Sequence, residues 1–308
     1  MVTVQSITNY DKQHPTAITI GTFDGVHIGH RKILERLINN AKALKLKSTV
    51  LTFFPHPRMV LQKDADIHLL NTLEEKQQIL DKLGLDCLIV HPFTKSFSRL
   101  SATEFVRDIL VNQLQTKKII IGYDHRFGRN RNANINDLIA FGNVLDFEVE
   151  EIPAQEVDEV SVSSTKIRKA LAEGDIQTAN AYLGYEYILT GEVVRGHGLG
   201  RKLDFPTANL HIAETYKLIP KDGVYVVKST IGKKTVYGMM NIGFNPTIEG
   251  KGRSMEVHFF DFNDDLYGEK IQLALTHRIR DEYKFDTLEE LKKQLGSDME
   301  ISRTLIDK

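Results

Sequence analysis

The hydrophobic pattern of this 308-residue chain changes its period once, and that change constrains the fold more than any other feature. Up to about residue 184, short and nearly continuous apolar runs alternate with segments of helical spacing. Continuous apolar strands are typical of a sheet buried on both faces, so this half predicts an α/β domain with a parallel sheet. From Tyr187 onward, strand-like runs are separated by Gly, Asp, Asn and Lys turns. They predict an antiparallel β-barrel domain with a terminal helix over 287–306, and hence two domains, 1–184 and 185–308.

The expected elements of the first half follow one another closely. We expect strands over 17–23, 48–54, 86–93, 117–124 and 147–153. We expect helices over 28–45, 72–84, 101–114, 135–145, 163–173 and 175–183. A Ser or Thr three residues before a Glu predicts capping boxes at Thr72, Ser101 and Thr287. Ligands of parallel sheets bind outside the carboxyl ends of the strands, so the segments that follow the strands are the candidate sites.

Charge and cysteine content narrow the class of protein. The 40 Lys and Arg residues nearly balance the 41 Asp and Glu residues, and the formal charge of −1 does not favour a broad nucleic-acid footprint. The single cysteine, Cys87, excludes a disulfide framework and fits a reducing cytoplasm. There is no signal-peptide pattern, and no apolar run approaches the roughly 18 residues of a membrane helix. We expect a cytoplasmic protein with small-molecule substrates and neither nucleic acid nor a membrane as partner; its oligomeric state stays open.

The segment TFDGVHIGHR (22–31) follows the first predicted strand and begins a helix. Free backbone N–H groups and the helix dipole favour a phosphate at such a junction. His27 and His30 are three residues apart, so both can project from one side of the first turn and stabilise charge on an α-phosphate as pyrophosphate leaves. The letters H-I-G-H also fit an aminoacyl-tRNA synthetase, or merely a capped helix with surface histidines. The chain has no Walker loop and no G-x-G-x-x-G turn after a strand, so ATP in this half must use this junction.

Two further segments carry cations where an anion could bind. In SVSSTKIRKAL (161–171), Lys166 and Arg168 lie at a helix start, against the preference of the helix dipole. In GYDHRFGRNRNAN (122–134), three arginines and one phenylalanine follow a predicted strand. The alternatives are a solvated basic turn for the first segment and a flexible basic loop for the second.

Together with TFFPHP (52–57), these segments resemble the N-terminal FMN adenylyltransferase module of the bacterial bifunctional riboflavin kinase/FAD synthetases. The second half resembles the riboflavin kinase module of the same family through GHGLGRKLDFPTANL (196–210), NIGFNPT (241–247) and EVHFFDFNDDLYG (256–268). The resemblance covers nearly the whole chain. It implies a nucleotidyltransferase-like, Rossmann-type first domain and two reactions. Riboflavin and ATP give FMN and ADP, and FMN and ATP then give FAD and pyrophosphate, with Mg²⁺ as cofactor.

The resemblance also implies site residues for adenylyl transfer. His27 and His30 would contact the ATP phosphates as catalytic residues. Further ATP-binding and phosphate-binding residues of this module would be Gly21, Phe23, Asp24, Gly29, Ser164, Thr165 and Arg168. The flavin would be bound by Phe54, Pro55, Pro57, Asp124, Arg126 and Phe127.

In the kinase module, Thr207 and Asn209 are two apart and would point the same way if extended, offering neutral oxygen ligands to Mg²⁺. Glu256 is the candidate general base for the ribityl 5′-hydroxyl; taken alone, without the P-T-A-N segment and the resemblance, a solvated sheet face would explain it better. The loop over ATP would use Gly196, Gly198, Gly200 and Arg201.

The sequence departs from the family at four positions. The family usually has Phe at His125 and Gly at Asn130, Ala133 and Asp204. The first three lie in the adenylyltransferase flavin loop, so an alternative is a riboflavin kinase with a weakened or inactive adenylyltransferase domain. A second alternative is a non-catalytic, flavin-responsive regulator. The synthetase hypothesis expects a K-M-S-K-S-like loop and an RNA-binding domain, and the chain offers only SSTKIR and a near-neutral β domain.

Overall fold

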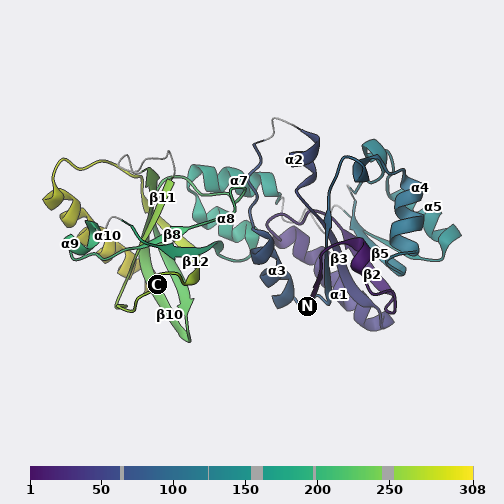
Figure 1. Ribbon diagram of the computed structural model, residues 1–308, viewed down its shortest axis with the longest axis horizontal. Helices are drawn as coiled ribbons and strands as arrows, with labels where there is room; N and C mark the ends of the chain where they lie inside the picture. Colours follow the sequence, from purple (N-terminus) through teal and green to yellow (C-terminus); the bar gives the residue numbers. More distant parts are fainter. Residues whose placement is uncertain (63–65, 124, 154–161, 197–198, 245–252, 308) are drawn as a thin grey trace. The chain divides into compact units, whose positions relative to one another are not determined.

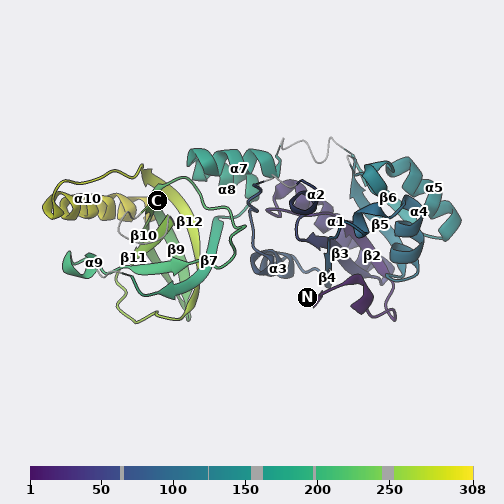
Figure 2. The same ribbon diagram turned by 45° about the horizontal axis from the view of Figure 1, so that its top comes forward.

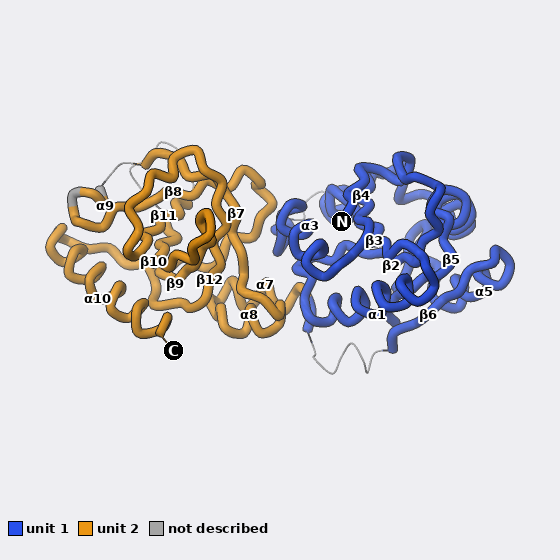
Figure 3. Tube along the Cα trace, turned by 90° about the horizontal axis from the view of Figure 1, so that it is seen from below, with its two compact units in different colours: residues 1–163 blue, residues 164–308 orange. Residues whose placement is uncertain are grey.

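The computed structural model describes residues 1–62, 66–123, 125–153, 162–196, 199–244 and 253–307. The chain forms two compact units, Met1–Ser163 and Ser164–Lys308, which Figure 3 shows in blue and orange. Each unit has its own sheet. The boundary at 184/185 that the periodicity predicts stays a prediction, because it concerns functional modules rather than compactness.

The first unit is built on a six-stranded sheet of the order β1-β4-β3-β2-β5-β6, with every paired strand parallel (Figure 1). The strands are β1 (Val2–Val4), β2 (Thr16–Ile20), β3 (Lys47–Phe54), β4 (Cys87–Pro92), β5 (Thr116–Gly122) and β6 (Glu148–Ile152). The predicted parallel α/β sheet is confirmed. The short edge strand β1 was not predicted, because three residues carry no periodicity. The strand order reverses beside β2, so this sheet has a switch point where ligands bind outside the carboxyl ends.

Helices cover both faces of this sheet. They are α1 (Ile28–Leu44), α2 (Pro57–Leu61), α3 (Leu73–Lys82), α4 (Ala102–Glu104), a π-helix (Phe105–Val111) and α5 (Ile135–Leu145). Short 3₁₀ turns form at Ile7–Asn9, Phe97–Arg99 and Arg129–Arg131. Isoleucines of β2 and β5 pack with the π-helix and α5 in one core, and α1 packs on β2 and β3 with Leu34, Leu37 and Ala41 buried.

Two predicted details of the first unit change. Strand β2 ends at Ile20 rather than residue 23, because the backbone turns left-handed at Phe23. The predicted helix over 101–114 is mainly a π-helix, in which Asn112 N–H donates to Arg107 O and Leu114 N–H to Ile109 O. The capping boxes at Thr72 and Ser101 are confirmed.

The second unit is a closed antiparallel barrel of the order β10-β11-β8-β7-β12-β9, flanked by helices, as predicted (Figure 2). Its strands are β7 (Tyr187–Val194), β8 (Ala208–His211), β9 (Gly223–Ile231), β10 (Lys234–Phe244), β11 (Arg253–Phe259) and β12 (Lys270–Arg280). Its helices are α7 (Ser164–Glu173), α8 (Ile176–Leu183), α9 (Leu199–Lys202) and α10 (Leu288–Ile306). Helix α8 joins the barrel through Asn180, whose Nδ2 donates to Leu275 O and whose Oδ1 accepts from Tyr187 N.

Helix α10 packs on the barrel through Leu291, Leu295, Met299 and Ile306. Its buried Asp298 accepts a bidentate ion pair from Arg280, the last residue of β12, with Nη2 2.7 Å from Oδ2 and Nε 3.0 Å from Oδ1. Thr287 caps the helix by accepting from Glu290 N, but Glu290 accepts from Asp286 N instead of from Thr287, so the predicted capping box is only half formed.

Candidate active sites

The loop between β2 and α1 carries the first candidate site. Phe23 and Val26 have φ values of 44° and 38°, a left-handed conformation that strains a non-glycine residue, above all a β-branched one. The loop is held from the side: Asp24 Oδ1 accepts from Leu70 N at 2.9 Å, and Thr22 O accepts from Lys76 Nζ at 2.6 Å. Strained backbone that is held from outside in this way is typical of functional sites.

His27 and His30 stack on each other, with ring centroids 3.7 Å apart and an angle of 17° between the planes. Both histidines therefore project together, as predicted from their spacing. His27 is the N-cap of α1, because its Nδ1 accepts from His30 N at 3.4 Å. A neutral His27 therefore carries its proton on Nε2. His27 is also only 6% exposed, so the alternative that it is an ordinary surface histidine is wrong.

Burial keeps both imidazoles neutral. Loss of solvation lowers the pKa of His27 to about 4. Loss of solvation, with His27 and Lys76 as further causes, lowers the pKa of His30 well below its ordinary value. Within the part of the chain that the structure describes, the buried Nδ1 of His30 has no hydrogen-bond partner. The pair can thus offer N–H donors to an anion without itself being cationic.

Two more predicted segments meet this loop at the same edge of the sheet. β3 and β5 are the neighbours of β2, so TFFPHP after β3 and the segment after β5 leave the sheet at the carboxyl end beside Gly21 and Phe23. β3 ends at Phe54, and a cis Pro55 and Pro57, the first residue of α2, follow it. Gly29 is buried in the first turn of α1.

The segment after β5 splits into an exposed and a buried part. Arg126 is exposed, whereas Phe127 is buried in the core, with its ring centroid 6.1 Å from that of Phe105. Asp124 lies outside the described residues. The predicted flavin contacts of these residues stay predictions.

Ser164, Thr165 and Arg168 lie on the first turns of α7, which belongs to the second compact unit. Thr165 is exposed, and the buried residues of the helix are Ile167, Ala170 and Leu171. Their predicted contact with ATP phosphates stays a prediction.

The second candidate site is a polar row on the outer face of the barrel. Burial alternates along β11, with Met255, Val257 and Phe259 inside and Glu256 half-buried outside. Glu256 lies directly opposite Asn209 of β8 and Asn241 of β10, so the three side chains share one face.

The two predicted metal ligands lie beside Glu256. Thr207, just before β8, donates from Oγ1 to Glu256 Oε2 at 3.2 Å. Asn209 lies opposite the same carboxylate. Hydroxyl, amide and carboxylate oxygens therefore gather here. These are the hard donors that Mg²⁺ prefers when most of its other ligands are waters and phosphates. Among the described residues, no three His, Cys, Asp or Glu side chains are grouped for a metal.

Two glycines of the segment before β8 lie in close contacts. A Cβ at Gly196 would meet the Asn209 side chain, and a Cβ at Gly200 would overlap the Phe205 carbonyl, so Gly200 needs glycine. Arg201 Nη2 lies 3.4 Å from Tyr267 Oη. Gly198 lies outside the described residues.

Family models match both halves of the chain in this order. The model described as FAD synthetase matches residues 9–166, and the model described as riboflavin kinase matches residues 183–306. The chain belongs to the bifunctional riboflavin kinase/FMN adenylyltransferase family. A member from Buchnera aphidicola subsp. Schizaphis graminum is 39% identical over 290 residues, 93% of this chain and 92% of its own length. One from Haemophilus influenzae is 38% identical over 293 residues, 94% of each chain.

A solved structure from Streptococcus pneumoniae, titled a macrolide-efflux protein, covers 98% of both chains with a TM-score of 0.88 and 31% identity. Its title names a different class of protein from the family models and the curated relatives. In the residues described for this chain, no helix is long and apolar enough to span a membrane.

Two of the four departures from the family lie at positions of positive φ, a conformation that favours glycine. Asn130 and Asp204 have φ values of 56° and 67°. Asn and Asp are the non-glycine residues that best tolerate this conformation, so the backbone of both loops is kept. Ala133 pairs with Phe127 in an isolated β-bridge. Asp204 forms an ion pair with Lys292 of α10, with Oδ2 2.5 Å from Nζ, so the negative charge that it adds is compensated.

Two residues near these family sites were missed from the sequence. Asn241 stands in the row with Glu256, and its Nδ2 donates to Glu282 Oε1 at 3.2 Å. Lys76 reaches the loop of His27 and His30 from α3. Asn241 belongs to the motif NIGFNPT, and the register of this strand with β11 would have placed it beside Glu256. Lys76 lies among other charged residues of a helix, and nothing in the sequence marks it as buried.

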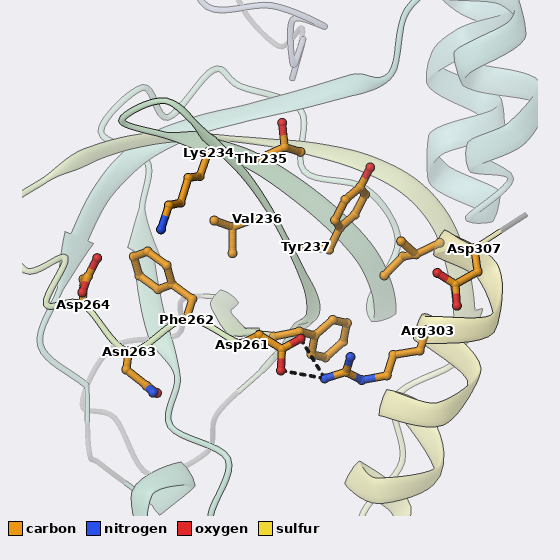
Figure 4. A pocket seen from close by; sticks show the side chains of 12 residues that line it. Lys234, Thr235, Val236, Tyr237, Asp261, Phe262, Asn263, Asp264, Arg303 and Asp307 are labelled. Atoms are coloured by element: carbon orange, nitrogen blue, oxygen red, sulfur yellow. Dashed lines mark hydrogen bonds and ion pairs between the residues drawn. The ribbon is translucent and has the colours of Figure 1, made fainter.

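A further pocket of about 450 Å³ lies between the β9–β10 hairpin, the segment after β11 and the end of α10 (Figure 4). None of the predicted site residues lines it. The Arg303 guanidinium in it is paired with Asp261, with both oxygens 3.1 Å from Nη2, and lies over the Phe260 ring. This pocket is thus separate from the row at Glu256.

Proposed function

We propose that the chain phosphorylates riboflavin with ATP at the Glu256 row and adenylylates the resulting FMN with ATP at the His27–His30 loop. The observation that carries the proposal is the presence of two sites of different chemistry, one in each unit. Each site is built from the motifs of one family module. Small molecules in the cytoplasm are the proposed substrates, and the near-neutral charge of the chain supports this over nucleic acid.

In the first reaction, the riboflavin 5′-hydroxyl oxygen attacks the γ-phosphorus of ATP. A new O–P bond forms, the bond to ADP breaks, and Glu256 takes the hydroxyl proton. Thr207 and Asn209 would hold Mg²⁺, and Thr207 already touches the Glu256 carboxylate, so the metal ligands and the base are neighbours. When bound, the ion supplies positive charge against the phosphates.

In the second reaction, an oxygen of the FMN phosphate attacks the α-phosphorus of ATP, and the bond to pyrophosphate breaks. No proton has to be abstracted and no covalent enzyme intermediate is needed, so the protein's task is positioning and charge stabilisation. His27 Nε2–H, the His30 ring and the free N–H groups at the start of α1 are the proposed donors.

Purified full-length protein incubated with riboflavin, ATP and Mg²⁺, with products separated by chromatography, tests the proposal. We expect FMN first and FAD later. If neither product appears, both assignments are wrong. FMN without FAD would instead favour a kinase with an inactive adenylyltransferase domain.

A further inference from the structure

Lys76 is a buried cation that the motif-based assignment leaves unexplained. Its side chain lies in the first turn of α3, and the residue is only 5% exposed. Lysines are almost never buried unless paired, and a cation in the first helical turn opposes the helix dipole. Burying Lys76 in the first turn of α3 therefore lowers the stability of the fold, and we expect the residue to have a functional role that compensates for this cost.

The ammonium group acts on the strained loop. Lys76 Nζ donates to Thr22 O at 2.6 Å, and this is its one hydrogen bond within the described part of the chain. Thr52 Oγ1 of β3 donates to the same carbonyl at 3.3 Å. Thr22 directly precedes Phe23, the first left-handed residue of the loop, so Lys76 holds the backbone where it departs from β2.

The charge of Lys76 also matters at this site. Because both histidines are neutral, they supply hydrogen-bond donors but no net positive charge. Lys76 lies within electrostatic reach of His30, whose pKa it helps to lower, and of Asp24, which opposes the lowering of the Lys76 pKa by burial. In a water-poor site a fixed charge of this kind acts more strongly than in solvent.

We propose that Lys76 is a positioning residue of the adenylyl-transfer site: its buried ammonium holds the loop through Thr22 O and so keeps the His27–His30 pair aimed. The proposal rests on the proposed function of this loop. It adds a residue from α3, outside the motif that carries the two histidines.

The test is Lys76→Met in the full-length chain, assayed for FAD formation from supplied FMN and for FMN formation from riboflavin. We expect kcat for FAD formation to fall about 10- to 100-fold, with a smaller change in KM for ATP, and kinase activity to stay within about twofold. The acid limb of the pH profile for FAD formation should move to higher pH, because Lys76 adds to the effects of burial and of His27 in lowering the pKa of His30, and only Lys76 is removed. Entry of water into a loosened loop would move the limb in the same direction, so the shift is compared with that of Thr52→Val, which loosens the same carbonyl but keeps the charge.

Three variants complete the test. Lys82→Met removes an exposed lysine of the same helix and should leave both activities unchanged. Thr52→Val removes the other hydrogen bond to Thr22 O but keeps the charge, so it should not move the acid limb. Lys76→Gln keeps an N–H donor without the charge. It should therefore shift the acid limb while retaining more of kcat than Lys76→Met, and it replaces Lys76→Met if that variant does not fold.

NMR titration of the His27 and His30 ring protons separates this proposal from the proposed function. Even if the wild-type chain makes no FAD, loss of Lys76 should raise the titration midpoint of His30. Wild-type kcat, an unshifted acid limb and unshifted ring titration in the Lys76 variants would overturn the proposal.

Discussion

The two candidate sites are built in opposite ways. At the β2–α1 loop the groups are buried, the imidazoles are neutral, and the backbone is strained and held from α3. On the barrel, Glu256, Thr207 and Asn209 are half-buried on an outward face and lie on or beside regular strands. The groups of the first site are buried in their unit, whereas those of the second lie on the outward face of the barrel.

This difference follows from the chemistry proposed for each site. Adenylyl transfer from ATP to an existing phosphate needs no base, so neutral donors and a fixed geometry suffice. Phosphoryl transfer to a hydroxyl needs a proton acceptor, and Glu256 is the carboxylate proposed for that role. We therefore expect the two sites to respond differently to substitution and to pH.

The largest expected effect is at the barrel. Glu256→Gln removes the proton acceptor without changing the size of the side chain, and we expect FMN formation to fall about 10²- to 10⁴-fold. FAD formation from supplied FMN should stay as in the wild type. Glu192→Gln, at an exposed position of β7, is the matched control. Retention of kinase activity in Glu256→Gln would remove the carboxylate from the mechanism.

The converse substitution is His30→Ala. We expect FAD formation to fall about 10²- to 10³-fold, the loss found when one donor to developing charge is removed, and FMN formation to continue. Separate measurement of the two products in one sample checks this. Loss of both activities in a folded variant would contradict two independent sites.

A smaller effect concerns stability against pH. The folded chain keeps His27 neutral down to about pH 4, whereas the unfolded chain takes up a proton near pH 6.5. Its contribution to stability is therefore full above about pH 6.5 and is lost as the pH falls toward 4, amounting to about 3 kcal/mol over that window. Unfolding should be followed by far-UV circular dichroism, because the chain has no tryptophan.

In that measurement, His27→Gln should weaken the loss of stability between pH 6.5 and 4, and His14→Gln, at an exposed position, should not. An equally steep loss in the wild type and in His27→Gln would show that His27 is not the group responsible.

The smallest expected effect is at Asp204. Asp204→Gly restores the residue usual in the family but removes an ion pair with Lys292 in which both side chains are largely exposed. Exposed pairs contribute about 0–1 kcal/mol, so we expect the free energy of unfolding to change by less than about 1 kcal/mol and KM for ATP to change by less than about twofold. A change of tenfold or more in KM would mean that the carboxylate acts on the nucleotide or its metal.

The sequence predicted both architectures because each half repeats one hydrophobic period over many elements. It also predicted that His27 and His30 lie together, since helical geometry fixes the relation of residues three apart. It could not predict that His27 caps its own helix or that the rings stack, because both depend on how the loop is turned at Phe23 and Val26.

Long-range contacts were the other limit. Periodicity places Glu256 and His258 on one face of a strand, but only the register with β8 and β10 brings Asn209 and Asn241 beside Glu256. Lys76 reads as an ordinary helical charge until α3 is packed against the loop after β2. Motifs therefore indicated the candidate sites, while tertiary packing decided which other residues lie beside them.

The ion pair between Arg280 and Asp298 has a consequence for engineering the barrel. Arg280 leads directly into the segment that carries Glu282, the partner of Asn241 in the polar row. Removing one member of a buried pair leaves the other charge uncompensated, at a cost of about 3–5 kcal/mol. Helix α10 contributes none of the proposed chemical groups, yet a barrel without it would lose the apolar cover of Phe205 and Phe260 together with Asp298. A minimal kinase design should therefore keep helix α10.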